Sequence, residues 1–117
     1  MKIENYQKAG AIIAAGGSSH RMGEIDKLFA PLGGRPVLAR VLDAFQGCEP
    51  VDRIVLVVSR DNLKKAEGLV TEYGFSKVSD VVAGGERRQD SVAAGLAKLT
   101  GCDWVIVHDG ARPLVTP

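Results

Sequence analysis

Short, wholly apolar runs alternate along the chain with segments whose apolar residues recur at helical spacing. Ala11–Ala15 and Ile54–Val58 are apolar at every position, which predicts strands that are covered on both faces. Trp104–Val107 has the same character, with Trp104 expected in the core, and Val78–Ala83 is a weaker version of it. The pattern therefore predicts four strands of a sheet that helices cover.

Amphipathic segments fill the gaps between these strands and predict three helices. The first begins near Pro36 and ends near Gly47, the second ends at Gly74, and the third fits Asp90–Leu99. Each carries an apolar stripe on one face. The residues expected to face inward are Val37, Leu38, Val41, Leu42 and Phe45 in the first, Leu63, Ala66, Val70 and Tyr73 in the second, and Val92, Leu96 and Leu99 in the third.

Strictly alternating strands and helices are typical of a parallel α/β sheet, so the expected fold is a Rossmann-like three-layer α/β/α domain. In such sheets, ligands bind outside the carboxyl ends of the strands, where the strand order reverses. Three polar segments follow predicted strands and would meet at that edge: Gly16–Lys27, Gly84–Ser91 and His108–Pro113. The sequence thus predicts a ligand site built from these three segments.

Composition limits the partners that this site can serve. The 117 residues suit one domain, residues 1–117, and 15 basic against 14 acidic residues leave a net charge of only +1. Without a strong overall field, we expect neither nucleic acid nor a membrane surface as a partner. No apolar run approaches the roughly 20 residues of a spanning helix. Two cysteines without metal-site spacing fit a cytoplasmic protein.

The first polar segment combines small residues with two fixed positive charges. Ala14–Gly17 would let backbone N–H groups approach a ligand closely, and Arg21 and Lys27 follow. Stacked amides, a guanidinium fork and a mobile ammonium together suit a polyphosphate. The segment matches neither a P-loop nor a GxGxxG dinucleotide fingerprint. A plain surface turn, in which the small residues only make the bend, is the alternative interpretation.

The second segment, GGERRQDSV, joins two glycines to Arg88 and the hydroxyl of Ser91. A glycine amide and a serine hydroxyl can together recognise the edge of a base. Alternatively, the glycines only end the third strand, and Asp90 or Ser91 caps the following helix.

The third segment, VHDGARP, places Asp109 directly after a buried strand. A carboxylate there can hold Mg²⁺ against phosphate oxygens, because this ion commonly takes one or two carboxylates plus its substrate. Arg112 would lie beside the same phosphates. The alternative is that Asp109 caps a turn and pairs with Arg112. His20 and His108 lack the spacing of a metal pair. We expect His20 to be a solvated loop residue, and His108 either to support the site residues from behind or to be structural.

The three segments in this order resemble one enzyme family. An Ala-Ala-Gly strand end with Arg-Met and Lys, then GG-x-x-R-x-x-S-V, then V-H-D-x-A-R-P is similar to the 2-C-methyl-D-erythritol 4-phosphate cytidylyltransferases of non-mevalonate isoprenoid biosynthesis. The resemblance covers about Ala11 to Pro117 and implies a fold of the nucleotide-diphospho-sugar transferase type. It also implies a nucleotidyltransferase reaction with Mg²⁺, in which CMP passes from CTP to 2-C-methyl-D-erythritol 4-phosphate and pyrophosphate leaves.

The resemblance also implies a role for each matching residue. Backbone amides of one small-residue run would line the nucleotide: Ala14, Ala15, Gly16 and Gly17, with either glycine able to face the phosphates. Arg21 and Lys27 would be catalytic, gripping the triphosphate and stabilising charge on the α-phosphate. The remaining roles are cytosine recognition by Gly85 and Ser91, ordering of that loop by Arg88, Mg²⁺ ligation by Asp109, and support of the metal by Arg112.

Members of the family are about twice as long as this chain, and their second half carries the homodimer arm, most contacts to methylerythritol phosphate, and a further catalytic lysine and carboxylate. We therefore expect residues 1–117 to be the N-terminal part of a longer homodimeric enzyme, poorly active alone. Two alternatives stay open: a guanylyltransferase resembling those of the molybdenum cofactor, which share the Ala15–Gly23 pattern, and a non-catalytic nucleotide-binding module. A Rossmann dehydrogenase is disfavoured, since Ser59 and Arg60 stand where a ribose-binding carboxylate belongs.

Overall fold

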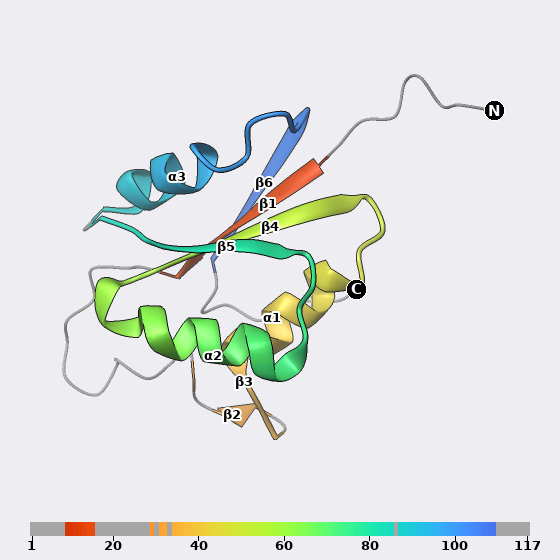
Figure 1. The fold of residues 1–117 in the computed structure, drawn as a ribbon, viewed down its shortest axis with the longest axis vertical. Helices are drawn as coiled ribbons and strands as arrows, with labels where there is room; N and C mark the ends of the chain where they lie inside the picture. The colour runs from red at the N-terminus through yellow and green to blue at the C-terminus, as the bar shows by residue number, and fades with distance from the viewer. Residues whose placement is uncertain (1–8, 16–28, 30, 33, 86, 110–117) are drawn as a thin grey trace.

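Four parallel strands form the central sheet of the molecule in a computed structural model that describes residues 9–15, 29, 31–32, 34–85 and 87–109. They are β1 (Ala9–Ala15), β4 (Val51–Val58), β5 (Val78–Ala83) and β6 (Trp104–Asp109). Their order across the sheet is β5-β4-β1-β6, and every neighbouring pair is parallel (Figure 1). All four predicted strands and the parallel α/β fold are thereby confirmed.

The order of the strands contains one reversal, and it lies beside β1. The chain moves outward from β1 to β4 and β5, and then returns to pair β6 with the other side of β1. The carboxyl ends of β1 and β6 therefore flank the topological switch point, where ligands bind in sheets of this kind.

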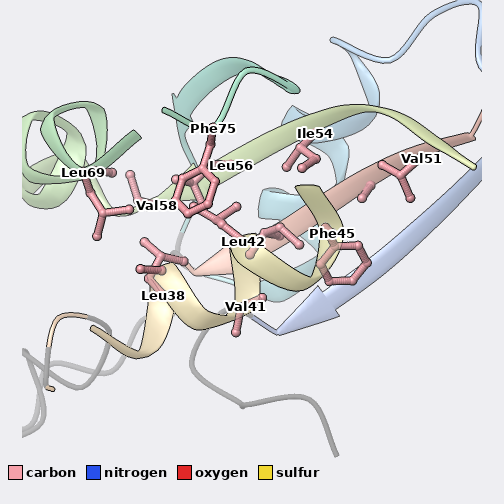
Figure 2. Packing of buried hydrophobic residues seen from close by; sticks show 14 residues of the cluster. Leu38, Val41, Leu42, Phe45, Val51, Ile54, Leu56, Val58, Leu69 and Phe75 are labelled. Carbon is pink, nitrogen blue, oxygen red and sulfur yellow. The ribbon is translucent and has the colours of Figure 1, made fainter. Parts of the chain in front are cut away.

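Helices cover both faces of this sheet, which gives the three layers expected from the sequence. The helices α1 (Val37–Gln46) and α2 (Leu63–Tyr73) pack on one face, and α3 (Arg88–Leu96) packs on the other (Figure 1). Because side chains alternate along a strand, Ile13 joins the larger core beneath α1 and α2, whereas Ile12 joins the smaller core beneath α3. Figure 2 shows the larger core, in which Leu38 and Leu42 of α1 pack among side chains from β4 and α2.

The predicted ends of the first two helices are close to those observed. Pro36 directly precedes α1 and Gly47 follows it. A 3-10 turn, η1 (Arg60–Asn62), leads into α2, and Gly74 ends that helix with φ of 68°, a conformation that glycine adopts without steric cost.

A small hairpin, β2 (Pro31–Leu32) and β3 (Arg35–Pro36), precedes α1 and was not predicted. Its strands of two residues each are too short to produce a hydrophobic pattern. Arg35 fastens it to both helices of this layer. Its Nη2 donates to Asp43 Oδ1 at 3.0 Å, and its guanidinium lies 4.4 Å from the centre of the Tyr73 ring.

The third helix differs from the prediction in its bounds and in its buried face. It spans Arg88–Leu96 rather than Asp90–Leu99, and Leu96, expected inward, is 47% exposed. Val92 and Leu99, the other two residues expected inward, do pack in the smaller core. Ser91 and Gly95 are also buried on this side, and the apolar pattern did not mark them, because a glycine and a serine can lie closer to the sheet than a leucine can.

The expectation that Trp104 belongs to the core is also wrong in the described structure. Its side chain is 59% exposed, and Ile106 on the same strand is also exposed. Both belong to β6, which lies at one edge of the described sheet and pairs there with β1. An edge strand has a neighbour on one side only, so apolar residues on it are covered less completely than the same residues on β1 or β4.

Two helical glycines, Gly68 in the middle of α2 and Gly95 in the last turn of α3, provide a test of how closely α3 lies on the sheet. A Cβ at Gly95 would stand 2.8 Å from Ile12 Cγ2, whereas a Cβ at Gly68 in α2 would meet nothing within 4 Å. Alanine at Gly68 should therefore stabilise the chain by roughly 0.5–1 kcal/mol through helix propensity. The same change at Gly95 should destabilise it, because overpacking costs about 1–3 kcal/mol.

Urea unfolding of both variants at constant buffer composition would measure the two shifts. Stabilisation by Gly95→Ala as large as that by Gly68→Ala would contradict the close contact between α3 and β1.

Within the part of the chain that the structure describes, no helix combines the length and the apolar character that crossing a bilayer requires. Cys48 and Cys102 are both free thiols rather than disulfide partners.

Candidate functional site

The carboxyl ends of the four strands lie in register along one edge of the sheet. Ala15 pairs with Val58, and Val58 with Ala83. On the other side of β1, Ala14 pairs with Asp109. The starts of the three polar segments are thus aligned along one edge, with Asp109 at the last position of β6 rather than just after it.

Asp109 and Ala14 lie on the α3 side of the sheet. The ring of His108 packs against Phe45 of α1, with 5.5 Å between ring centres. Because successive side chains point to opposite faces, Asp109 belongs to the opposite face from His108. Ala14 lies two residues after Ile12, which packs on that same α3 side. His108 thus points away from the predicted metal ligand and toward the larger core.

The turn after β5 is held tightly between β4 and the start of α3. Gly84 N donates to Val58 O at 2.8 Å, which continues the pairing of β4 with β5. Ser91 is only 2% exposed. A Cβ at Gly84 would overlap Ser91 Oγ and would stand 2.7 Å from Val57 Cγ1. Glycine is therefore required here so that the serine hydroxyl can lie against the end of the sheet.

Gly85 is in an equally close contact with the first turn of α3. A Cβ at Gly85 would overlap Asp90 Cβ and lie 2.8 Å from Asp90 Oδ2. The same carboxylate accepts a hydrogen bond from Arg87 N at 3.2 Å, so Asp90 is the N3 residue of a capping box whose N-cap is Arg87. Gly85 itself is exposed, so its backbone groups remain accessible next to the buried Ser91.

The structure describes five of the predicted site residues in full, and all five lie at this one edge of the sheet: Ala14, Ala15, Gly85, Ser91 and Asp109. Arg88 is the first residue of α3. The other predicted residues lie outside the described residues: Gly16, Gly17, Arg21, Lys27 and Arg112, and with them His20. The described part of the site thus comprises the end of β1, the turn after β5 and the end of β6.

The carboxylate of Asp109 is the one predicted metal ligand. Within the described ranges, no group of three or more His, Cys, Asp or Glu residues is placed to hold a metal ion. One carboxylate at a strand end does fit Mg²⁺, which draws its other ligands from water and substrate phosphates.

Comparison with known proteins identifies the family. Residues 9–117 match the family described as IspD, 2-C-methyl-D-erythritol 4-phosphate cytidylyltransferase. The chain belongs to this family. A 2-C-methyl-D-erythritol 4-phosphate cytidylyltransferase of Dehalococcoides mccartyi is 58% identical over 111 residues, which are 95% of this chain and 49% of the relative.

A bifunctional IspD/IspF enzyme of Desulforudis audaxviator is 51% identical over 91% of this chain, and the match covers 27% of that relative. The crystal structure of 4-diphosphocytidyl-2C-methyl-D-erythritol synthase from Anaerococcus prevotii superposes with a TM-score of 0.76 at 29% identity, covering 96% of this chain and 47% of that chain. The chain spans about half the length of the monofunctional cytidylyltransferases that it matches.

Phe29 lies close in sequence to the first polar segment, and the sequence analysis did not single it out. It packs partly buried against the larger core, and Lys65 Nζ lies 5.0 Å from its ring centre. Phe29 follows Lys27 by two positions, so it anchors the chain directly after the first polar segment. The signal that could have found it was an aromatic residue only two positions along the chain from Lys27.

An open groove of about 430 Å³ runs beside α3, lined by Gln89, Val92, Ala93 and Leu96. None of the residues that resemblance to the cytidylyltransferases marks as functional lines it. The exposed Leu96 forms part of the groove wall. The candidate site is therefore placed at the strand ends, where the predicted site residues lie, and not in this groove.

Proposed function

We propose that this chain supplies the CTP-binding part of a 2-C-methyl-D-erythritol 4-phosphate cytidylyltransferase, which transfers CMP from CTP to 2-C-methyl-D-erythritol 4-phosphate and releases pyrophosphate. Family membership supports this proposal. The observation that carries it is the register that aligns Ala14, Asp109 and the turn after β5 at one sheet edge. From β5 to β6 this edge spans three strand spacings, about 14 Å, comparable to an extended nucleoside triphosphate.

We place the phosphates of CTP at the part of this edge formed by the ends of β1 and β6. The reaction joins a phosphomonoester to a triphosphate, so its main requirement is to neutralise charge and to align the two groups. Backbone amides of Ala14–Gly17 would bind the nucleotide, and Arg21 and Lys27 would stabilise charge that builds on the α-phosphate. Neither role needs a covalent intermediate with the protein.

Asp109 would hold Mg²⁺, with Arg112 supporting that arrangement. When bound, the ion would neutralise charge on the phosphate oxygens of CTP. Asp109 pairs with Ala14 across the switch point, which places this carboxylate next to the proposed phosphate end.

The turn after β5 is the proposed cytosine end. The exposed Gly85 directly follows Gly84, against which the Ser91 hydroxyl packs, and Arg88 would order the turn from the start of α3. Amide and hydroxyl groups of fixed orientation discriminate bases better than an apolar surface does, because a wrong base leaves them unpaired. The assignment thus predicts a preference for CTP over GTP.

A coupled assay of pyrophosphate release from CTP and methylerythritol phosphate, with Mg²⁺ present, tests the function. It should be run on the product of the intact reading frame, alongside the 117-residue chain. We expect turnover with CTP and little with GTP. Binding of CTP without turnover would favour a non-catalytic module, and preference for GTP would favour a guanylyltransferase. We also propose that the enzyme is a cytoplasmic homodimer. Sedimentation of the product of the intact reading frame would test the dimer, and cell fractionation would test the location.

A further inference from the structure

We propose that Asp90 is a positioning residue for nucleotide binding: its carboxylate fixes the turn that presents Gly85 and Ser91 to the base. This inference rests on the proposed function and names a residue that sets the affinity of the same site for CTP. Asp90 does not itself contact the nucleotide in this proposal. It acts through the two neighbours that do.

The first observation is the hydrogen bond that closes the turn. Arg87 N donates to Asp90 Oδ2 at 3.2 Å, and Asp90 N and Ser91 N both donate to Arg87 O, at 3.0 Å and 3.2 Å. These bonds tie the residue just before α3 to its first turn in both directions. The direction in which the helix leaves the turn is therefore set at Asp90.

The second observation is the contact between Asp90 and Gly85. The Asp90 side chain fills the space that a Cβ at Gly85 would need. On the neighbouring position, Ser91 Oγ fills the corresponding space at Gly84, whose N–H is bonded to Val58 O. Two consecutive residues of α3 thus pack on two consecutive glycines, so a shift of the Asp90 side chain moves the Gly85 backbone relative to the Ser91 hydroxyl.

The ion pair with Arg87 is not what gives Asp90 this role. Arg87 Nε lies 3.7 Å from Asp90 Oδ2, and the Arg87 side chain is 71% exposed. Exposed pairs of this kind contribute little to stability. The hydrogen bond to the backbone and the packing on Gly85 remain as the contacts that Asp90 alone supplies.

The expected kinetic effect is specific to CTP. Chemistry takes place at the α-phosphate, away from the base, so contacts to cytosine bind substrate and transition state equally well. Loss of such contacts raises KM and leaves kcat nearly unchanged. Loss of folded protein does the opposite: the apparent kcat falls with the active fraction, and KM stays constant.

The test is steady-state kinetics of Asp90→Ala in the product of the intact reading frame, with CTP and methylerythritol phosphate varied in turn. We expect KM for CTP to rise about fivefold, which corresponds to the loss of about one hydrogen bond's net binding free energy. We expect kcat to stay within about twofold of the parent value and KM for methylerythritol phosphate to stay unchanged. Asp90→Asn, which keeps an acceptor for Arg87 N, should restore most of the affinity for CTP.

Glu67→Ala is the matched control, because it removes the same charge from an exposed position of α2 and should leave all three constants at their parent values. An unchanged KM for CTP in Asp90→Ala, with kcat falling in step with the folded fraction measured by circular dichroism, would overturn the inference while leaving the proposed function intact. A parent protein that does not turn over CTP at all would overturn the proposed function, and this inference with it.

Discussion

Replacement of Lys27 by alanine is expected to lower kcat about a hundredfold, which corresponds to roughly 3 kcal/mol of transition-state stabilisation. Lys27 is the proposed mobile charge at the α-phosphate, where negative charge builds as the two anions combine. A positive charge at this position stabilises the transition state more than it stabilises bound CTP, so kcat should fall by a larger factor than KM rises. Pyrophosphate release by the product of the intact reading frame, at saturating CTP, measures the loss.

Lys64→Ala is the control for this experiment, since Lys64 is an exposed lysine of α2 and its loss should leave kcat unchanged. Lys27→Arg would retain the charge but replace a compact ammonium by a planar fork, so a partial recovery of kcat is expected. If Lys27→Ala kept the parent kcat and only raised KM for CTP, Lys27 would be a ground-state binding residue rather than a catalytic one.

Leu42→Ala should destabilise the 117-residue chain by about 3 kcal/mol and lower its Tm by roughly 12 °C. Leu42 is fully buried on α1 in the centre of the larger core, as Figure 2 shows. The loss combines the transfer free energy of the side chain with the cost of the cavity it leaves. Domains of this size are stable by about 5–15 kcal/mol in total, so this one change would remove a large part of the margin.

Leu96→Ala makes the same chemical change at a leucine that is 47% exposed, and it should cost about 1 kcal/mol or less. Thermal and urea unfolding of the two variants side by side would give the comparison. Equal losses at the two positions would show that the side of α3 bearing Leu96 is buried in solution, contrary to the structure.

The sequence was sufficient wherever one local pattern left a single solution. A run such as Ala11–Ala15, apolar at every position and short, predicts a strand covered on both faces, and β1 contains it. The stripe on α1 was equally clear, because its large apolar residues are the ones that meet the core. The Gly84-Gly85 pair marked the end of the third strand, but the sequence could not show that Ser91 and Asp90 pack against these two glycines.

Local patterns misled where packing reversed the usual preference for large residues inside. On α3 the sheet side carries Ser91 and Gly95 in addition to the predicted Val92, and at Gly95 the helix lies so close to Ile12 that even a Cβ would be crowded. On β6 the apolar run did mark a strand, but burial depends on neighbours. Trp104 lies on an edge strand of the described sheet and is exposed there.

By itself, the sequence determined the four strands of the sheet and its three helices, the α/β class and the residues proposed to carry the chemistry, since each depends on side chains close together in the chain. Only the tertiary structure decided the order β5-β4-β1-β6, the pairing of Ala14 with Asp109, and the face of the sheet on which Asp109 lies. Those features depend on hydrogen bonds between strands far apart in the chain. Periodicity, which is a property of one segment at a time, contains no information about which strands pair.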